Sequence, residues 1–104
     1  MNKENKKIYI SGPIAGYDLE ERKLAFLKVQ HMLEEKGYTP VNPFDNGVPD
    51  DAHWRTHMRA DIRMLVDCQA IFMMPAWERS KGCKLELDVA SSCDIDVILN
   101  ESDL

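Results

Sequence analysis

Apolar residues follow two different periods along this 104-residue chain. Short apolar runs bounded by turn residues predict strands at 7–10, 39–41, 70–74 and 95–99. Between the runs, apolar residues recur every three or four positions and predict helices at 19–36, 54–65 and 80–90. The alternating order predicts an α/β fold, a small doubly wound parallel sheet of about four to five strands with helices on both faces.

Residues at the element ends support these boundaries. Ser80 is a preferred N-cap residue, and Gly37 suits the left-handed conformation in which many helices end. Pro40 has no backbone N–H, so either the 39–41 strand lies at a sheet edge or the proline stands at the start of the strand.

One carboxylate lies on the apolar face of the last predicted helix. At about 100° per residue, Cys83, Leu87 and Ala90 share one face of that helix. Glu86 lies with them. A carboxylate among apolar residues is costly unless it is partnered, and its pKa tends to rise. Such a group suits acid, base or nucleophilic chemistry.

Asp61 repeats this pattern in the preceding helix. It lies near the centre of the apolar stripe formed by Trp54, Met58, Ile62 and Leu65. For a single inward acid, a structural role as a buried acceptor or as half of an ion pair is the more common explanation. Two inward acids, each on a helix that follows a separate loop, favour a site.

The predicted fold brings these acids toward three loops. In doubly wound sheets, ligands bind beyond the carboxyl ends of the strands, where the chain places residues 11–16, 42–53 and 75–82. The 42–53 loop is long for so small a domain, which favours a functional role. Tyr9 lies near the end of the first strand, so its hydroxyl is expected in the same pocket as Glu86 and Asp61.

Other chemistries have weaker signals. The 11–16 loop has glycines but matches neither a dinucleotide-binding nor a Walker motif. His53, His57 and Asp61 are spaced by four, yet the H-E-x-x-H pattern is missing, so no metal site is expected. No cofactor is expected either. Cys83 is a weak candidate for a nucleophile, because it has no evident histidine partner. Candidates for stacking on a base, with core or lid packing as the alternative, are Phe44, Trp54 and Trp77.

Composition predicts one soluble domain over residues 1–104, with residues 1–6 as a disordered tail. The net charge is −5 and the basic residues are dispersed, which argues against nucleic-acid binding. No apolar run is long enough for a membrane span, and no signal peptide precedes the first strand. The three cysteines lack metal-like spacing, so a reduced, cytoplasmic location is expected.

Three motifs, taken in their order along the chain, resemble those of the nucleoside 2-deoxyribosyltransferase superfamily. They are Ile8-Tyr9-Ile10-Ser11-Gly12-Pro13-Ile14, Asp61-x-x-x-Leu65-x-x-Cys68 and Ser80-x-Gly82-x-x-x-Glu86-x-x-x-Ala90. The chain is most similar to the DUF4406 branch, of which the run Trp77-Glu78-x-Ser80-Lys81-Gly82 is typical. The resemblance covers about residues 7–98.

The resemblance implies an enzyme that cleaves or transfers the N-glycosidic bond of a 2′-deoxynucleoside or its 5′-monophosphate. Glu86 would be the nucleophile that forms a glycosyl ester, and Tyr9 would orient it. Asp61 would protonate the leaving base or activate the acceptor. A homo-oligomer is implied as well. Expected substrate contacts are Ser11, Gly12, Pro13, Ile14, Gly16, Asn42, Pro43, Trp77, Ser80 and Gly82.

Departures from the pattern leave a second hypothesis open. Related deoxynucleoside 5′-monophosphate N-hydrolases hold the phosphate partly with a serine and an arginine of the first loop, where this chain has Pro13 and Ala15. Ser80 matches a third phosphate contact, at a helix N-terminus that favours anions. The alternative is a non-catalytic nucleotide-binding module on the same fold.

Overall fold

Four parallel strands form the sheet of this protein, in a computed structural model that describes residues 6–104. The predicted N-terminal tail therefore lies outside the described residues, apart from Lys6. The sheet order is β2-β1-β3-β4, and every neighbouring pair is parallel. The strands are β1 (Lys7–Ser11), β2 (Thr39–Val41), β3 (Ala70–Met73) and β4 (Asp96–Ile98).

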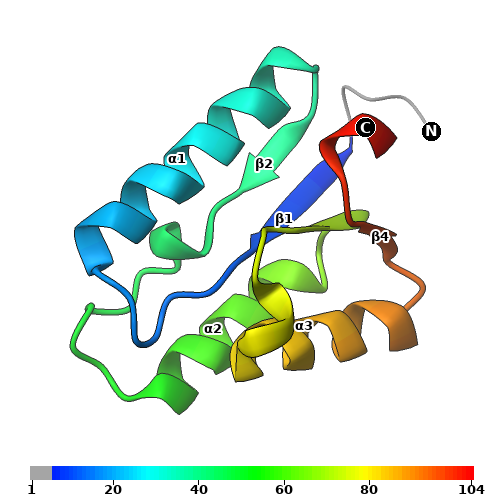
Figure 1. Ribbon diagram of the computed structural model, residues 1–104. Helices are drawn as coiled ribbons and strands as arrows, with labels where there is room; N and C mark the ends of the chain where they lie inside the picture. The colour runs from blue at the N-terminus through cyan, green and yellow to red at the C-terminus, as the bar shows by residue number, and fades with distance from the viewer. Residues whose placement is uncertain (1–5) are drawn as a thin grey trace.

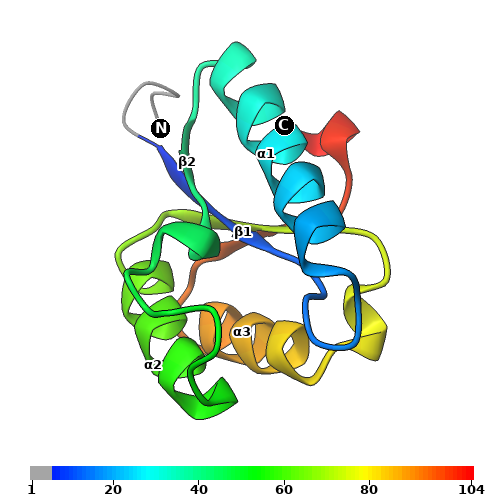
Figure 2. The same cartoon turned by 90° about the vertical axis from the view of Figure 1, so that its left-hand side faces the viewer.

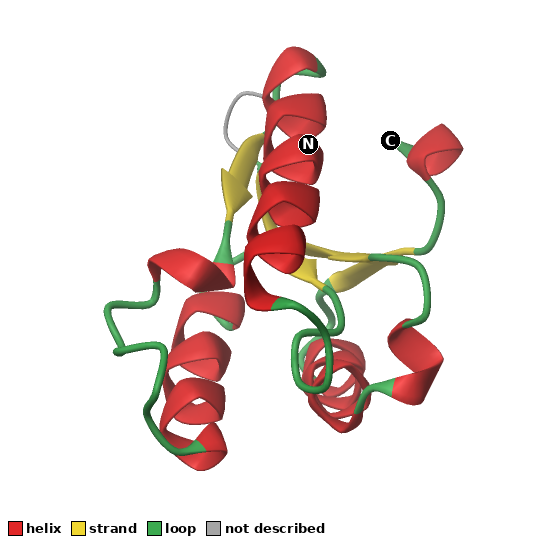
Figure 3. Cartoon of the chain, turned by 60° about the vertical axis from the view of Figure 1, so that its left-hand side comes forward, coloured by secondary structure: helices red, strands yellow, loops and turns green. Residues whose placement is uncertain are grey.

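Helices cover both faces of the sheet, as predicted. The helix α1 (Leu19–Glu35) lies on one face, whereas α2 (Trp54–Leu65) and α3 (Lys81–Ser92) lie on the other (Figures 1, 2 and 3). The chain winds from β1 outward to β2 and then returns to β3 on the far side of β1. The order of the strands reverses there, so the crevice between the loops after β1 and β3 is the expected ligand site.

Two apolar clusters sandwich the central strand β1. Ile8 and Ile10 pack with Phe26 and Leu33 of α1, whereas Tyr9 packs on the opposite face. Because successive side chains of a strand point to opposite faces, the buried Tyr9 and Ser11 both face α2 and α3. Tyr9 and Ser11 are 0% and 1% exposed, which means that their polar atoms need partners within the protein.

Capping residues fix the helix ends, and those at Ser80 and Gly37 agree with the prediction. The Ser80 hydroxyl accepts a hydrogen bond from the Cys83 backbone N–H (3.1 Å) at the start of α3. Gly37 follows α1 with a φ of +92°, as a left-handed C-cap requires. His53 caps α2, because its Nδ1 accepts from the Arg55 backbone N–H (3.1 Å).

Some boundaries differ from the expectation. The third strand ends at Met73, and the last strand covers 96–98 rather than 95–99. The 42–53 segment contains a 3-10 turn, Pro43–Asp45, which begins with a proline and is capped by Asn42. Two further 3-10 turns are Trp77–Arg79 and Glu101–Asp103.

Among residues 6–104, no helix has both the length and the apolar character needed to span a membrane.

Candidate active site

A pocket of about 410 Å³ opens beyond the carboxyl ends of β1 and β3. Its volume is within the range of known ligand sites, roughly 300–1,000 Å³. The walls come from the loop after β1, the segment after β2, and the helices α2 and α3. Tyr9, Asp61 and Glu86 all line it, so the three residues predicted to carry the chemistry converge from three elements.

Glu86 is held at both of its carboxylate oxygens. The Tyr9 hydroxyl donates a hydrogen bond to Oε2, and the Ser11 hydroxyl donates one to Oε1 (2.8 Å). The glutamate is 5% exposed. Burial raises its pKa to about 7; the two hydroxyls oppose that rise, and the nearby Asp61 charge adds to it. The result is a carboxylate that is oriented, poorly solvated and close to its titration point at neutral pH.

Tyr9→Phe is expected to raise the pKa of Glu86 further. Burial keeps the pKa of Tyr9 well above its ordinary value, so its hydroxyl stays a donor that favours the ionised glutamate. Losing this bond corresponds to a rise of roughly one pH unit. The measurement is an NMR titration of ¹³C-labelled glutamate carboxyls, with the exposed Tyr17→Phe as the control. An unchanged Glu86 midpoint in Tyr9→Phe would show that the hydroxyl does not tune this carboxylate.

Asp61 faces the same pocket from α2. It is 7% exposed, and Asn46 Nδ2 donates a hydrogen bond to its Oδ1 (2.8 Å). Burial raises the pKa of Asp61, while the bond from Asn46 and the nearby His57 work against that rise. A carboxyl group whose protonated form is favoured by burial suits the role of a general acid.

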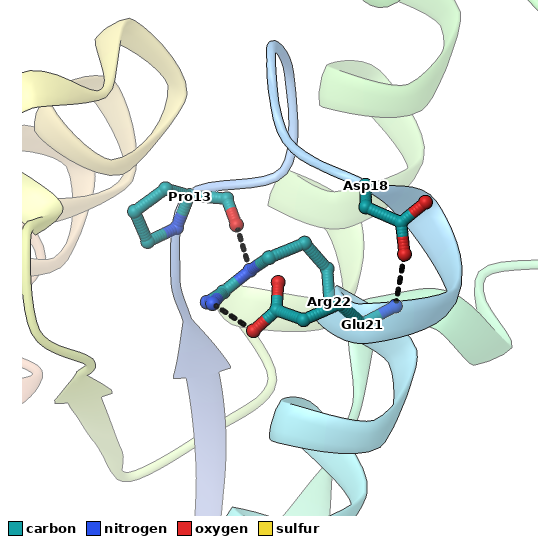
Figure 4. A network of polar contacts seen from close by, with 4 residues as sticks. All are labelled: Pro13, Asp18, Glu21 and Arg22. Atoms are coloured by element: carbon teal, nitrogen blue, oxygen red, sulfur yellow. Dashed lines mark hydrogen bonds and ion pairs between the residues drawn. The ribbon is translucent and has the colours of Figure 1, made fainter.

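The loop after β1 is fixed by α1. Arg22 Nε donates a hydrogen bond to the Pro13 carbonyl oxygen (2.7 Å), as Figure 4 shows. Asp18 caps the first turn of α1 by accepting from the Glu21 N–H (3.0 Å), which fixes the helix end that carries Arg22. At Gly12, an added Cβ would lie 2.5 Å from Met74 Sδ and 3.0 Å from Phe26 Cζ, so a larger residue would force these side chains to shift where the loop leaves β1.

Cationic and aromatic side chains flank the pocket mouth. Lys81 Nζ lies 4.7 Å from the centre of the Trp54 ring, which joins the first turns of α2 and α3. Trp54 was expected within the apolar stripe of its helix, but it is 39% exposed and lines the pocket. On the other side, Lys23 Nζ pairs with Asp50 (2.9 Å) and ties the 42–53 segment to α1.

The structure brings together some of the predicted substrate contacts and separates others. Ser11 binds Glu86, and the pocket lining includes Gly12, Ile14, Pro43, Ser80 and Gly82. Four others do not line it: Pro13, Gly16, Asn42 and Trp77. The Asn42 side chain instead bonds Gln30 and the Phe44 N–H, and Trp77 lines a separate groove beside α1. Contact with a substrate stays a prediction for all of them.

Several lining residues were not predicted from the sequence. Asn46 and His57 lie beside Asp61, and Arg79 and Lys81 lie beside Ser80. The available signals were the length of the 42–53 loop and the placement of His57 one turn before Asp61. His53, His57 and Asp61 have a spacing that could suit a metal site; within residues 6–104, no three His, Cys, Asp or Glu side chains are grouped to hold a metal ion.

A family model described as "Domain of unknown function (DUF4406)" matches residues 6–99. Among solved structures, the chain is similar to a 2-deoxyribosyltransferase from Leishmania mexicana, with 23% identity and a TM-score of 0.68 over 88% of this chain and 61% of that one. It is also similar to a 2-deoxyribosyltransferase from Bacillus psychrosaccharolyticus (18% identity, TM-score 0.66, 88% and 69% covered). A conserved protein from Enterococcus faecalis V583 gives 20% identity and a TM-score of 0.64, with 88% and 60% covered. No curated protein matches the chain.

At such low identities these structures establish a shared fold, and the chain spans only 61% of the length of the Leishmania enzyme. The family match, in contrast, covers nearly the whole chain. The fold and the family agree with the resemblance that the three sequence motifs indicated. The chain therefore belongs to the DUF4406 family and has the fold of the 2-deoxyribosyltransferases.

Proposed function

We propose that this protein cleaves or transfers the N-glycosidic bond of a 2′-deoxynucleoside or a deoxynucleoside 5′-monophosphate. One observation carries the proposal: a buried glutamate, held at both oxygens by Tyr9 and Ser11, shares a pocket with a second buried carboxyl, Asp61. A nucleophilic carboxylate with an acid partner is the pair that glycosidic chemistry by a covalent route requires.

In the first step, a Glu86 oxygen attacks C1′ of the deoxyribose. The bond from C1′ to the base nitrogen breaks, its electron pair stays with the base, and Asp61 supplies a proton to the base. Each Glu86 oxygen accepts one hydrogen bond from these hydroxyls and has a second lone pair, so the hydroxyls orient the carboxylate without blocking attack. The product of this step is a glycosyl ester of Glu86.

In the second step, water or a second base attacks C1′ and the ester bond breaks. The electron pair returns to Glu86 as carboxylate, and the proton of the attacking group passes to Asp61, which restores the starting state. Two displacements at C1′ retain its configuration. Hydrolysis and transfer therefore use the same residues, and they differ only in which acceptor reaches the ester.

A pocket with two basic side chains near Ser80 is consistent with a substrate that carries a phosphate. Arg79 and Lys81 flank Ser80 at the start of α3. The first loop, however, contributes Ala15 to the pocket and no charged side chain. Nucleosides and their 5′-monophosphates therefore both belong in a test. A homo-oligomer and a cytoplasmic location stay predictions.

The test is chromatography of free base released from a panel of deoxynucleosides and their 5′-monophosphates. Each reaction runs with and without a second base. Base release by the wild-type protein is expected, and a new nucleoside formed from the added base would assign transfer. If folded protein binds a nucleotide and releases no base from any member of the panel, the enzyme proposal fails for these substrates and the non-catalytic binding module is favoured.

A further inference from the structure

The side chain of Asn46 connects three groups of the pocket wall. Its Oδ1 accepts a hydrogen bond from the Val48 backbone N–H (2.9 Å). Its Nδ2 donates to Asp61 Oδ1 (2.8 Å) and lies 3.2 Å from His57 Nδ1. A backbone N–H can only donate, so the Val48 contact fixes which end of the amide is oxygen. Both hydrogens of the amide nitrogen are thereby directed to Asp61 and His57.

This orientation determines the proton on His57. Because Asn46 Nδ2 has no lone pair to offer, His57 Nδ1 must be the acceptor of their contact. In the neutral imidazole this places the ring hydrogen on Nε2. His57 therefore accepts one hydrogen of the Asn46 amide, and this contact keeps the other hydrogen directed to Asp61.

The same orientation distinguishes the two oxygens of Asp61. Oδ1 receives the hydrogen bond from Asn46, and a carbonyl oxygen accepts better than the oxygen of a protonated carboxyl. We propose that Asn46 is a positioning residue that directs the acidic proton of Asp61 to Oδ2, the oxygen outside this bond. The role rests on the proposed function, in which Asp61 gives that proton to the leaving base.

Charged and titratable groups surround Asp61 from every packed element. His57 lies on its own helix, Glu86 approaches from α3, and Tyr9 approaches from β1. Asn46 carries no charge, and its hydrogen bond lowers the pKa of Asp61 against the effect of burial. Its removal should therefore move the titration of Asp61 in one direction only, toward higher pH.

The test is an NMR titration of ¹³C-labelled aspartate carboxyls in the wild-type protein and in Asn46→Ala. The Asp61 midpoint is expected to rise by roughly one pH unit in the variant. The matched control is Asp45→Ala, which removes an exposed side chain from the neighbouring position of the same turn. An Asp61 midpoint that is the same in folded Asn46→Ala and wild type would overturn the proposal.

Activity provides a separate readout. In Asn46→Ala, kcat is expected to fall roughly ten- to a hundredfold, and the limb of the pH profile that reports Asp61 should move to higher pH. A merely structural role would lower the rate without moving either limb, and that result would overturn the proposal. If wild type releases no base, the proposed function fails, while the carboxyl titration still decides the role of Asn46.

A measurement on the wild-type protein covers the case in which Asn46→Ala does not fold. The ¹⁵N spectrum of labelled histidine at pH 8 is expected to show His57 with Nδ1 unprotonated and Nε2 protonated. A hydrogen on Nδ1 would face the Asn46 amide hydrogens, so a protonated Nδ1 would overturn the assigned arrangement.

Discussion

Glu86→Gln is expected to abolish base release from every substrate that the wild-type protein cleaves. An amide nitrogen or a neutral amide oxygen cannot form the glycosyl ester, so the covalent route loses its nucleophile. Removing a nucleophile of this kind lowers kcat by at least about a thousandfold. The measurement is chromatography of the free base, with enough protein and time to detect that residual rate.

The control for this experiment is Glu35→Gln, which makes the same chemical change at an exposed position of α1. This variant is expected to keep the wild-type rate. Calorimetry measures whether Glu86→Gln still binds a nucleotide, and this distinguishes a loss of chemistry from a loss of the pocket. If Glu86→Gln released base at the wild-type rate, the bond would be broken without this nucleophile and the covalent route would be wrong.

The inward direction of both acids could be predicted from the sequence because helical geometry is local. Residues three and four positions apart share a face, so the apolar neighbours of Glu86 and Asp61 report where those side chains point. Both are buried in the structure. The parallel sheet was predictable for a similar reason, since alternating strands and helices leave few connections that are right-handed and uncrossed.

The path of the 42–53 segment could not be predicted in this way. It has no apolar period, and its conformation depends on partners distant in the chain, such as the ion pair of Asp50 with Lys23. The contact of Asn46 with Asp61 follows from that path. Trp77 shows the same limit: its motif is recognisable, but in the structure it lines the groove beside α1 and packs against the apolar cluster that contains Tyr9.

The burial of the Glu86 carboxylate costs the folded protein stability. Burial raises the pKa of Glu86 from its ordinary 4.5 to about 7. Below pH 4.5 the group is protonated in both the folded and the unfolded chain, and no cost arises. Between these two values the folded state binds the proton more tightly, so stability falls as the pH rises. Above pH 7 both states are ionised and the cost is complete.

Glu86→Gln should therefore stabilise the protein at high pH while it removes the activity. The variant has no carboxylate to desolvate, so its free energy of unfolding relative to wild type should increase by about 3 kcal/mol between pH 4.5 and pH 8. Urea denaturation followed by circular dichroism at both pH values measures this difference, and pH effects common to both proteins cancel. Glu35→Gln, at an exposed site, should show no such dependence. A difference between Glu86→Gln and wild type that stays constant with pH would mean that Glu86 titrates in the folded protein as an ordinary glutamate does.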